Sequence, residues 1–347
     1  MADNQAGTAS ASVEIRKVVL IVAGLTVLLS LMLSAFSLPA VHSGTKGVPI
    51  GVVGAGPQVA ALTEQLESQQ FEVTRYDDAA AAKDAILDRE IYGSLEVAPG
   101  SVDVQVATAA SAAASQAIQG IGTKLAEVQS TQSGHYVAPT VTELRGFPAD
   151  DPKGAGLAAG ALPLALGGWI AAVLIMQLIG NSRDRILAVF AFSVVGGLAL
   201  VAVIQYVIGT FDGNYWLTSL AAMLGLAATA MGVLGLREFF GNAGLGIAAV
   251  ALILLGNPLS GLTSAPEMLP TPWGYLGQLL PPGATGALLR ACAYFSGTGG
   301  VHALIVLLCW LAGGLALYFA GLSRAAKKPG PEPDAQTTID EVAPTPA

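Results

Sequence analysis

The spacing of long apolar runs constrains this chain of 347 residues more than any other feature. One run begins at Val18 and ends near Leu38, a long stretch of mixed polar and apolar sequence follows, and five further runs lie between Gly156 and Leu322. A hydrocarbon core about 30 Å thick needs roughly 20 apolar residues in each helix that crosses it. The pattern therefore predicts one membrane span, an insert outside the membrane, and five more spans.

We accordingly expect an α-helical polytopic membrane protein with six spans, an extracytoplasmic α/β insert and a re-entrant segment before the last span. A mean hydropathy of +0.62 and only 12% charged residues support this class. The expected boundaries are 1–17 for a cytoplasmic N-terminus, 18–38 for the first span, 39–155 for the insert, 156–323 for the five-span domain and 324–347 for a disordered cytoplasmic tail. Within 156–323 we expect spans over 156–180, 186–209, 215–236, 240–257 and 301–322.

Basic residues in the short connecting segments predict the orientation. They all fall at one end of the expected spans: Arg16, Lys17, Arg183, Arg185, Arg237, Arg324, Lys327 and Lys328. The positive-inside rule assigns that end to the cytoplasm. We therefore expect a multi-pass plasma-membrane protein with both termini cytoplasmic and residues 39–155 extracytoplasmic. A signal peptide cleaved near Leu38-Pro39-Ala40 is the rival interpretation, but the apolar run exceeds the usual core of such peptides.

The insert alternates strand and helix patterns. Strands are expected over 48–53, 71–76, 92–97 and 102–106, helices over 58–69, 79–89 and 111–129, and an extended return to the membrane over 131–154. This alternation indicates a small α/β domain with a partly parallel sheet. The insert holds 14 acidic and 7 basic residues. This balance argues against nucleic-acid binding, which favours a basic patch.

Residues 257–300 form the second unusual segment, because it is rich in proline and yet strongly apolar. Backbone at membrane depth that is not helical must be satisfied within protein or along water. We expect two short helices, over 273–280 and 285–295, that dip into the outer leaflet. Trp273, Tyr275, Tyr294 and Phe295 would then lie at the interface, where aromatic residues are enriched.

Motifs for chemistry are absent from the sequence. The run Gly51-Val-Val-Gly-Ala-Gly56 has the wrong spacing for a dinucleotide-binding loop and is interpreted as a turn, and Asp77-Asp78 is interpreted as a helix cap. Cys292 and Cys309 lack metal-ligand spacing. No phosphate-binding loop of the Walker type occurs, so an ATPase would be another chain. We therefore expect no enzyme activity, no cofactor and no metal in this chain.

The expected spans carry almost no ionisable groups and many glycines. Buried charges usually mark ion or proton paths, so their scarcity disfavours an ion-coupled carrier. Paired or single glycines permit close helix packing or a dimer interface, and they stand at Gly167, Gly168, Gly196, Gly197, Gly225, Gly232, Gly235, Gly313 and Gly314.

A motif within 257–300 consists of Asn257-Pro-Leu-Ser-Gly-Leu-Thr-Ser-Ala-Pro-Glu-Met-Leu-Pro270, Trp273, Gly277-Gln278, Leu280-Pro281-Pro-Gly-Ala284 and Leu289-Arg290. The order of spans and insert, together with this motif, resembles the permease subunits of type-2 ABC exporters. Among these it most resembles the branch related to phage-infection protein (YhgE/Pip-like). The resemblance implies a homodimer or pseudo-symmetric heterodimer driven by separate cytoplasmic ATPase chains. It implies a coupling helix at 180–186 with Arg183, Asp184 and Arg185, and an outer gate with Trp273, Gln278, Pro281 and Arg290.

Two functional hypotheses follow. The first is an exporter permease that moves an amphipathic or lipid-linked molecule outward, since such a substrate could enter sideways between apolar helices. The second is a non-transporting, membrane-anchored surface or scaffold protein whose external domain binds an envelope partner.

Overall fold

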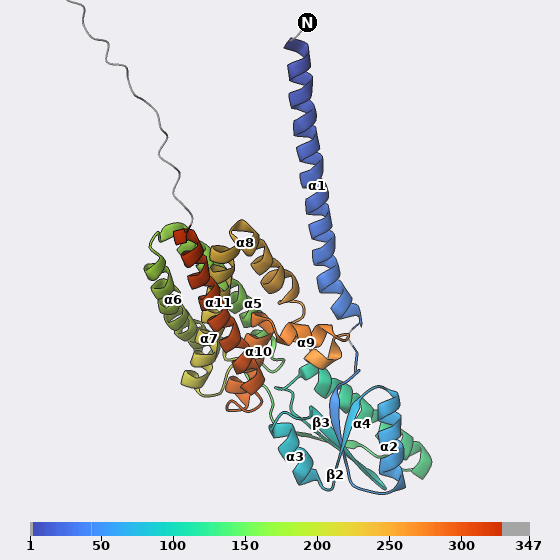
Figure 1. Ribbon diagram of the computed structural model, residues 1–347. Coiled ribbons are helices and arrows are strands. Elements are labelled where there is room, and N and C mark those ends of the chain that lie inside the picture. The colour runs from blue at the N-terminus through green and yellow to red at the C-terminus, as the bar shows by residue number, and fades with distance from the viewer. Residues whose placement is uncertain (1–2, 43, 328–347) are drawn as a thin grey trace, which may run out of the picture.

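The computed structural model describes residues 3–42 and 44–327, which form an apolar helical body, a small α/β domain at one end of it, and a long first helix (Figure 1). Helix α1 (Asp3–His42) runs beside the body and leads into the α/β domain. The expected tail over 328–347 lies outside the described residues, whereas residues 324–327 continue the last helix, α11 (Val301–Lys327).

Four helices are long and apolar enough to cross a membrane. They are Ile15–Ser34 within α1, Ser182–Ile208, Tyr215–Phe240 (α7) and Val301–Ala326 within α11. The second of these combines α6 (Ser182–Ala202) with a π-helical end, η1 (Val203–Ile208). Two shorter apolar helices, Leu166–Leu178 and Asn242–Leu255, stand where the sequence predicts two more spans. The count of six spans therefore stays a prediction.

The span expected over 240–257 is shorter in the structure. Helix α8 (Asn242–Ala249) and its π-helical continuation η2 (Val250–Leu255) together extend about 21 Å at 1.5 Å per residue, less than a hydrocarbon core. The residues that would have extended this helix at its N-terminal end instead form the turn in which the chain reverses direction. Gly241 has φ 66° and joins α7 directly to α8, and Gly244 packs against the Leu236 carbonyl.

Helix α7 is the centre of the body, and four helices pack around it at small residues. A Cβ added at Gly168 of α5 (Ala155–Leu178) would lie 2.8 Å from Thr229 of α7. On α6, a Cβ at Gly197 would lie 2.9 Å from the Met223 nitrogen. Gly225 of α7 similarly faces Thr285 of α10 (Pro281–Tyr294). Most of the glycines predicted to allow close helix packing therefore make their contacts between helices of the same chain.

The α/β domain contains a mixed five-stranded sheet in the order β2-β1-β3-β4-β5. Its strands are β1 (Pro49–Val53), β2 (Glu72–Tyr76), β3 (Gly93–Ala98), β4 (Ser101–Val106) and β5 (Pro139–Glu143). Only the β3–β4 hairpin is antiparallel; β1 pairs in parallel with β2 and β3, and β4 with β5. The expected partly parallel sheet is confirmed, but β5 falls in the stretch expected to be an extended return.

Helices α2 (Pro57–Ser68), α3 (Ala79–Leu87) and α4 (Ala112–Ser133) cover this sheet. Leu62 and Leu66 of α2 and Ile118 of α4 share one core with Ile50 and Leu95 of the sheet. The predicted cap is confirmed, because the Asp78 carboxylate accepts a hydrogen bond of 2.8 Å from the Ala81 amide.

The α/β domain and the helical body share a second hydrophobic core. It joins Ala85 and Ile86 of α3 to Leu157 of α5, Phe211 and Leu289. Polar contacts lie at the same junction. The Asp151 carboxylate accepts hydrogen bonds from Ala155 N (2.9 Å) and Gly156 N (2.8 Å) at the start of α5, and Arg145 forms an ion pair of 3.6 Å with Asp212. The domain is therefore docked on the body rather than tethered to it.

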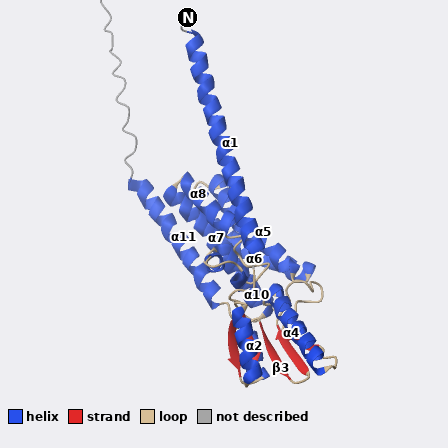
Figure 2. Cartoon of the chain, turned by 90° about the vertical axis from the view of Figure 1, so that its right-hand side faces the viewer, coloured by secondary structure: helices blue, strands red, loops and turns tan. Residues whose placement is uncertain are grey.

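Both ends of the described chain lie at the opposite pole from the sheet. Figures 1 and 2 show the start of α1 and the end of α11 pointing away from the α/β domain. Contacts at that pole join three helices: Arg185 of α6 pairs with Glu238 of α7 at 3.5 Å, and the Arg324 guanidinium of α11 lies 3.9 Å from the Phe239 ring centroid. The basic residues near these helix ends thus gather on one face of the body.

Close packing at α11 predicts a sharp contrast between two adjacent glycines. A Cβ on Gly314 would lie 2.5 Å from the Met231 carbonyl carbon of α7, whereas a Cβ on Gly313 has nothing within 4 Å. We expect Gly314→Ala to lower the free energy of unfolding by about 1–3 kcal/mol, because α7 and α11 must move apart.

Denaturant unfolding of the protein in detergent micelles measures this loss. Gly313→Ala is the matched control and should leave stability unchanged or slightly raised, since alanine has the higher helix propensity. Equal effects at the two positions would contradict the packing assignment.

Candidate functional site

A cavity of about 780 Å³ lies where the α/β domain meets the proline-rich segment before α11. Its lining comes from both parts of the molecule, with Arg89 and Tyr92 from the domain and Gln278 and Arg290 from the segment. The charged residues of the lining are Lys46, Glu72, Arg89, Glu267 and Arg290. Two residues of the predicted gate therefore border one cavity.

The segment folds as two short helices, as the sequence predicts. Helix α9 (Trp273–Gln278) follows a 3-10 turn, η3 (Pro266–Met268), and precedes α10. Helix α10 begins at Pro281 instead of the expected Thr285, because proline is favoured in the first turn, where its missing N–H is not needed. The Gln278 amide donates a 2.8 Å hydrogen bond to Ser260 O and so ties α9 to the preceding loop.

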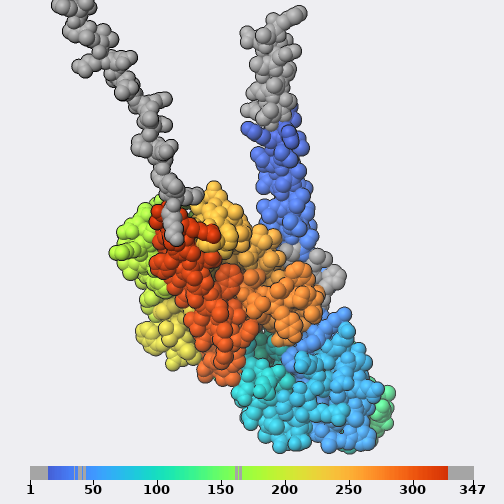
Figure 3. Space-filling view, in the orientation of Figure 1, coloured from blue at the N-terminus to red at the C-terminus, as the bar shows by residue number. Residues whose placement is uncertain are grey.

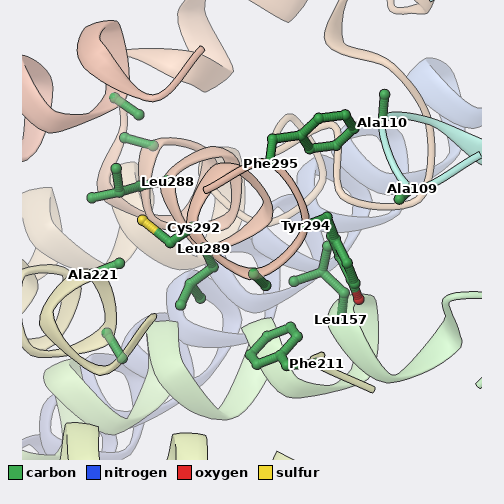
Figure 4. Close-up of a cluster of buried hydrophobic side chains, with 14 of the residues drawn as sticks. Ala109, Ala110, Leu157, Phe211, Ala221, Leu288, Leu289, Cys292, Tyr294 and Phe295 are labelled. Atoms are coloured by element: carbon green, nitrogen blue, oxygen red, sulfur yellow. The ribbon is translucent and has the colours of Figure 1, made fainter. Parts of the chain in front are cut away.

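The interfacial placement expected for the aromatic residues is wrong for two of the four. Trp273 and Tyr275 are exposed, but Tyr294 and Phe295 are buried. The Tyr294 hydroxyl donates a 2.8 Å hydrogen bond to Thr210 O, and its ring meets those of Phe147 and Phe211 edge to face. Figure 4 shows Tyr294 and Phe295 at the end of α10 within the core shared with the α/β domain. The hydroxyl finds a partner inside the protein, so it does not need the interface.

Arg290 stands in the middle of buried α10. Its side chain is only 7% exposed, and its Nη2 donates a 3.0 Å hydrogen bond to Leu262 O. Its Nε is buried without an acceptor among the described residues. Pro281, the remaining predicted gate residue, is also buried, whereas Trp273 lies on the outside. The four predicted gate residues therefore share a segment but not a single surface.

Arg89 enters the cavity from the α/β domain. It follows the end of α3 with φ 64°, and its guanidinium carbon lies 5.4 Å from the Phe295 ring centroid. Its Nη1 is buried without an acceptor in the described part of the chain. Burial lowers the pKa of Arg89. The side chain thus bridges the domain and the end of α10 by a cation–π contact.

A second bridge joins Tyr92 to the proline-rich segment. The Tyr92 hydroxyl donates a 2.8 Å hydrogen bond to Glu267 Oε2. Burial, followed by the nearby Glu267 charge, raises the pKa of Tyr92. Within residues 3–42 and 44–327, no carboxylate lies within 4.0 Å of either Arg89 or Arg290, so Glu267 neutralises neither guanidinium by direct pairing.

The predicted coupling residues lie at the other pole, in the first turn of α6. Arg183 and Asp184 are exposed, and Asp184 accepts a 3.1 Å hydrogen bond from the Asn181 amide. Arg185 is turned inward: its Nε donates to Ile179 O at 2.7 Å and it pairs with Glu238. There is no separate coupling helix over 180–186, and Arg185 closes the end of α5 instead of facing outward.

Sequence reasoning missed Arg89, Tyr92 and Glu267. Arg89 and Tyr92 sit in an ordinary helix-to-strand connection, and nothing local indicates that they reach a segment far along the chain. A usable signal was present at Glu267 and Arg290, because they are the only charged residues in 257–300. Isolated charges in apolar sequence commonly mark functional positions.

No known protein-family model matches the sequence, and no curated protein matches it either. Among the described residues, no group of three His, Cys, Asp or Glu side chains could hold a metal ion. Cys292 and Cys309 are free thiols. The site is therefore defined by its cavity and its two arginines.

The contrast between Arg185 and Arg183 gives a prediction. Arg185→Met should lower the free energy of unfolding by about 1.5–3 kcal/mol, because it removes charge-assisted hydrogen bonds and leaves Glu238 unpaired. Denaturant unfolding in micelles is the measurement. Arg183→Met, two residues earlier in the sequence and at an exposed position, is the matched control and should change stability little. A larger loss at Arg183 than at Arg185 would refute the assignment.

Proposed function

We propose that this chain is the membrane subunit of an ABC-type exporter, which moves an amphipathic or lipid-linked molecule outward with energy from a separate ATPase chain. The observation that carries the proposal is the α9–α10 hairpin. Its second helix is buried against α7 and α11 and also borders the cavity beneath the α/β domain. A segment so placed could open or close a path between the helical body and the outside.

Helix α7 provides a mechanical link between the two poles. At the pole with the basic residues, Glu238 of α7 pairs with Arg185 of α6. Closer to the middle of α7, Gly225 lies directly against Thr285 of α10. A displacement imposed on α6 by an ATPase would therefore reach α10 through one rigid, closely packed helix. The proposed signal runs from exposed Arg183 and Asp184 to this contact.

The proposed orientation places the basic pole in the cytoplasm and the acidic α/β domain outside. Two observations support this orientation: both ends of the described chain lie at the same pole, and basic residues gather there. The protein would then be a multi-pass plasma-membrane protein with six membrane-inserted helical segments, of which α8–η2 enters only part of the bilayer.

The space between helix α1 and the helical body supports the proposal of an amphipathic substrate. Helix α1 stands apart from the body in Figure 3, and none of its span Ile15–Ser34 is buried. A cavity of about 510 Å³ lies between Phe36 of α1, Ala158 of α5 and the loop around Gly261. A molecule with an apolar tail could reach this cavity from the bilayer. A second, identical or related subunit is proposed to complete the transport path.

The alternative is a surface or scaffold protein that does not transport. It is favoured by the small connections at the basic pole, where α5 and α6 are joined by residues 179–181 and α7 and α8 by Gly241 alone. These short connections offer little protruding surface for an ATPase to bind.

Co-purification distinguishes the two functions. The full-length tagged protein, extracted from its native membrane in mild detergent, should carry a chain with a Walker motif, identified by mass spectrometry. Arg183→Glu should reduce the recovered ATPase at least tenfold, because the exposed charge faces the docking surface. Arg185 is left intact in this test, since its loss would destabilise the fold.

Lys83→Glu, an exposed charge reversal on α3 of the α/β domain, is the control and should leave recovery unchanged. Recovery of the wild-type protein without any ATPase chain would reject the exporter and favour the scaffold function.

A further inference from the structure

We propose that the cavity between the α/β domain and α10 binds a phosphate group, held by Arg290 from α10 and Arg89 from the domain. The phosphate could belong to a lipid head group or to a free phosphate compound. This inference goes beyond the proposed function, because binding requires neither transport nor an ATPase.

The first observation is that Arg290 forms no direct ion pair within the described residues. The side chain is 7% exposed, donates one hydrogen bond to Leu262 O, and has no carboxylate within 4.0 Å in the described part of the chain. Its Nε is buried without an acceptor. An arginine stays protonated in proteins, and a buried charge without a partner is costly. An anion in the cavity would remove that cost.

The second observation is that a second guanidinium, from the α/β domain, lines the same cavity. Arg89 lies over the Phe295 ring and packs against Gly299. These contacts position the side chain but provide no hydrogen-bond acceptor for its guanidinium group. Its Nη1 is also buried without an acceptor. Two like charges that share one cavity repel each other unless an anion lies between them.

The charges of the whole lining leave room for an anion. The lining holds the basic residues Lys46, Arg89 and Arg290, the acidic residues Glu72 and Glu267, and His302. With His302 neutral, this set has one excess positive charge. The Glu267 carboxylate, whose Oε2 accepts the Tyr92 hydrogen bond, supplies one of the two negative charges in this count.

Phosphate fits this arrangement better than a carboxylate does. Guanidinium forks bind both groups in a bidentate manner, but a carboxylate presents one edge, whereas a tetrahedral phosphate presents oxygens in more than one direction and so could meet two forks. A phosphate monoester carries about −1.5 to −2 charge at pH 7. A cavity of about 780 Å³ also has space for the organic group attached to the phosphate.

Binding is tested on the full chain in a neutral detergent by calorimetry and thermal unfolding. The probes are inorganic phosphate, dihexanoyl phosphatidic acid and, as a probe without phosphate, dihexanoylglycerol. We expect saturable binding of at least one phosphate probe, with a rise in Tm, and no effect of dihexanoylglycerol. Equal binding of both phosphate probes indicates a free phosphate compound, and preference for phosphatidic acid indicates a lipid head group.

Arg290→Gln and Arg89→Gln should each weaken binding of the phosphate probe at least tenfold. Arg75→Gln, on the outer strand β2, is the matched control and should bind as the wild type does. If Arg290→Gln fails to fold, Arg89→Gln decides, because Arg89 lies at the domain surface of the cavity and is less deeply buried.

Ala287→Glu provides a test in the opposite direction. Ala287 lines the cavity one helical turn before Arg290, so the new carboxylate should replace the anion, raise Tm without phosphate and abolish the rise that phosphate causes. The proposal is overturned if wild type binds neither phosphate probe, or if both Arg89→Gln and Arg290→Gln keep wild-type affinity. Because no ATPase is present, either result leaves the exporter function standing.

Discussion

The structure depends on the small side chains along α7. Gly225, and the glycines of α5, α6 and α11 that face α7, let four helices approach its backbone closely. Larger residues at these positions would push the helices apart. Close approach buries α10 beside α7, and the burial of α10 in turn places Arg290 inside the protein. The chemistry of the cavity is therefore a consequence of how tightly the helical body packs.

Much of this architecture could be predicted from local sequence patterns. Apolar runs located the helical segments, and alternation of strand and helix patterns located most of the α/β domain. Strand β5 was missed because Pro139-Thr-Val-Thr-Glu143 is short and mostly exposed, so only its pairing with β4 distinguishes it from an extended loop. The length of α8–η2 also escaped prediction, since hydropathy does not reveal where Gly241 reverses the chain.

Only some of the residues of the candidate site could be predicted from the sequence. Gln278 and Arg290 were named only as gate residues that the family resemblance implies, and the structure places both at the cavity. Arg89 and Tyr92 were not, because their role depends on docking of the α/β domain, a long-range contact with no local signal. Burial of Tyr294 was missed for the same reason: its hydroxyl partner, Thr210 O, belongs to a distant connection. Local patterns describe elements well, whereas contacts between elements decide which side chains meet.

The junction between α1 and the sheet has a mechanical consequence. Soon after α1 ends at His42, the Gly44 amide donates a 2.9 Å hydrogen bond to Met268 O, and β1, which has a neighbour on both sides in the sheet, starts at Pro49. Helix α1 otherwise has few contacts with the body. A change in its tilt, caused by bilayer thickness or by a neighbouring subunit, would act as a lever on η3 and on the sheet together. The lipid surroundings of one isolated helix could thus set the width of the cavity between them.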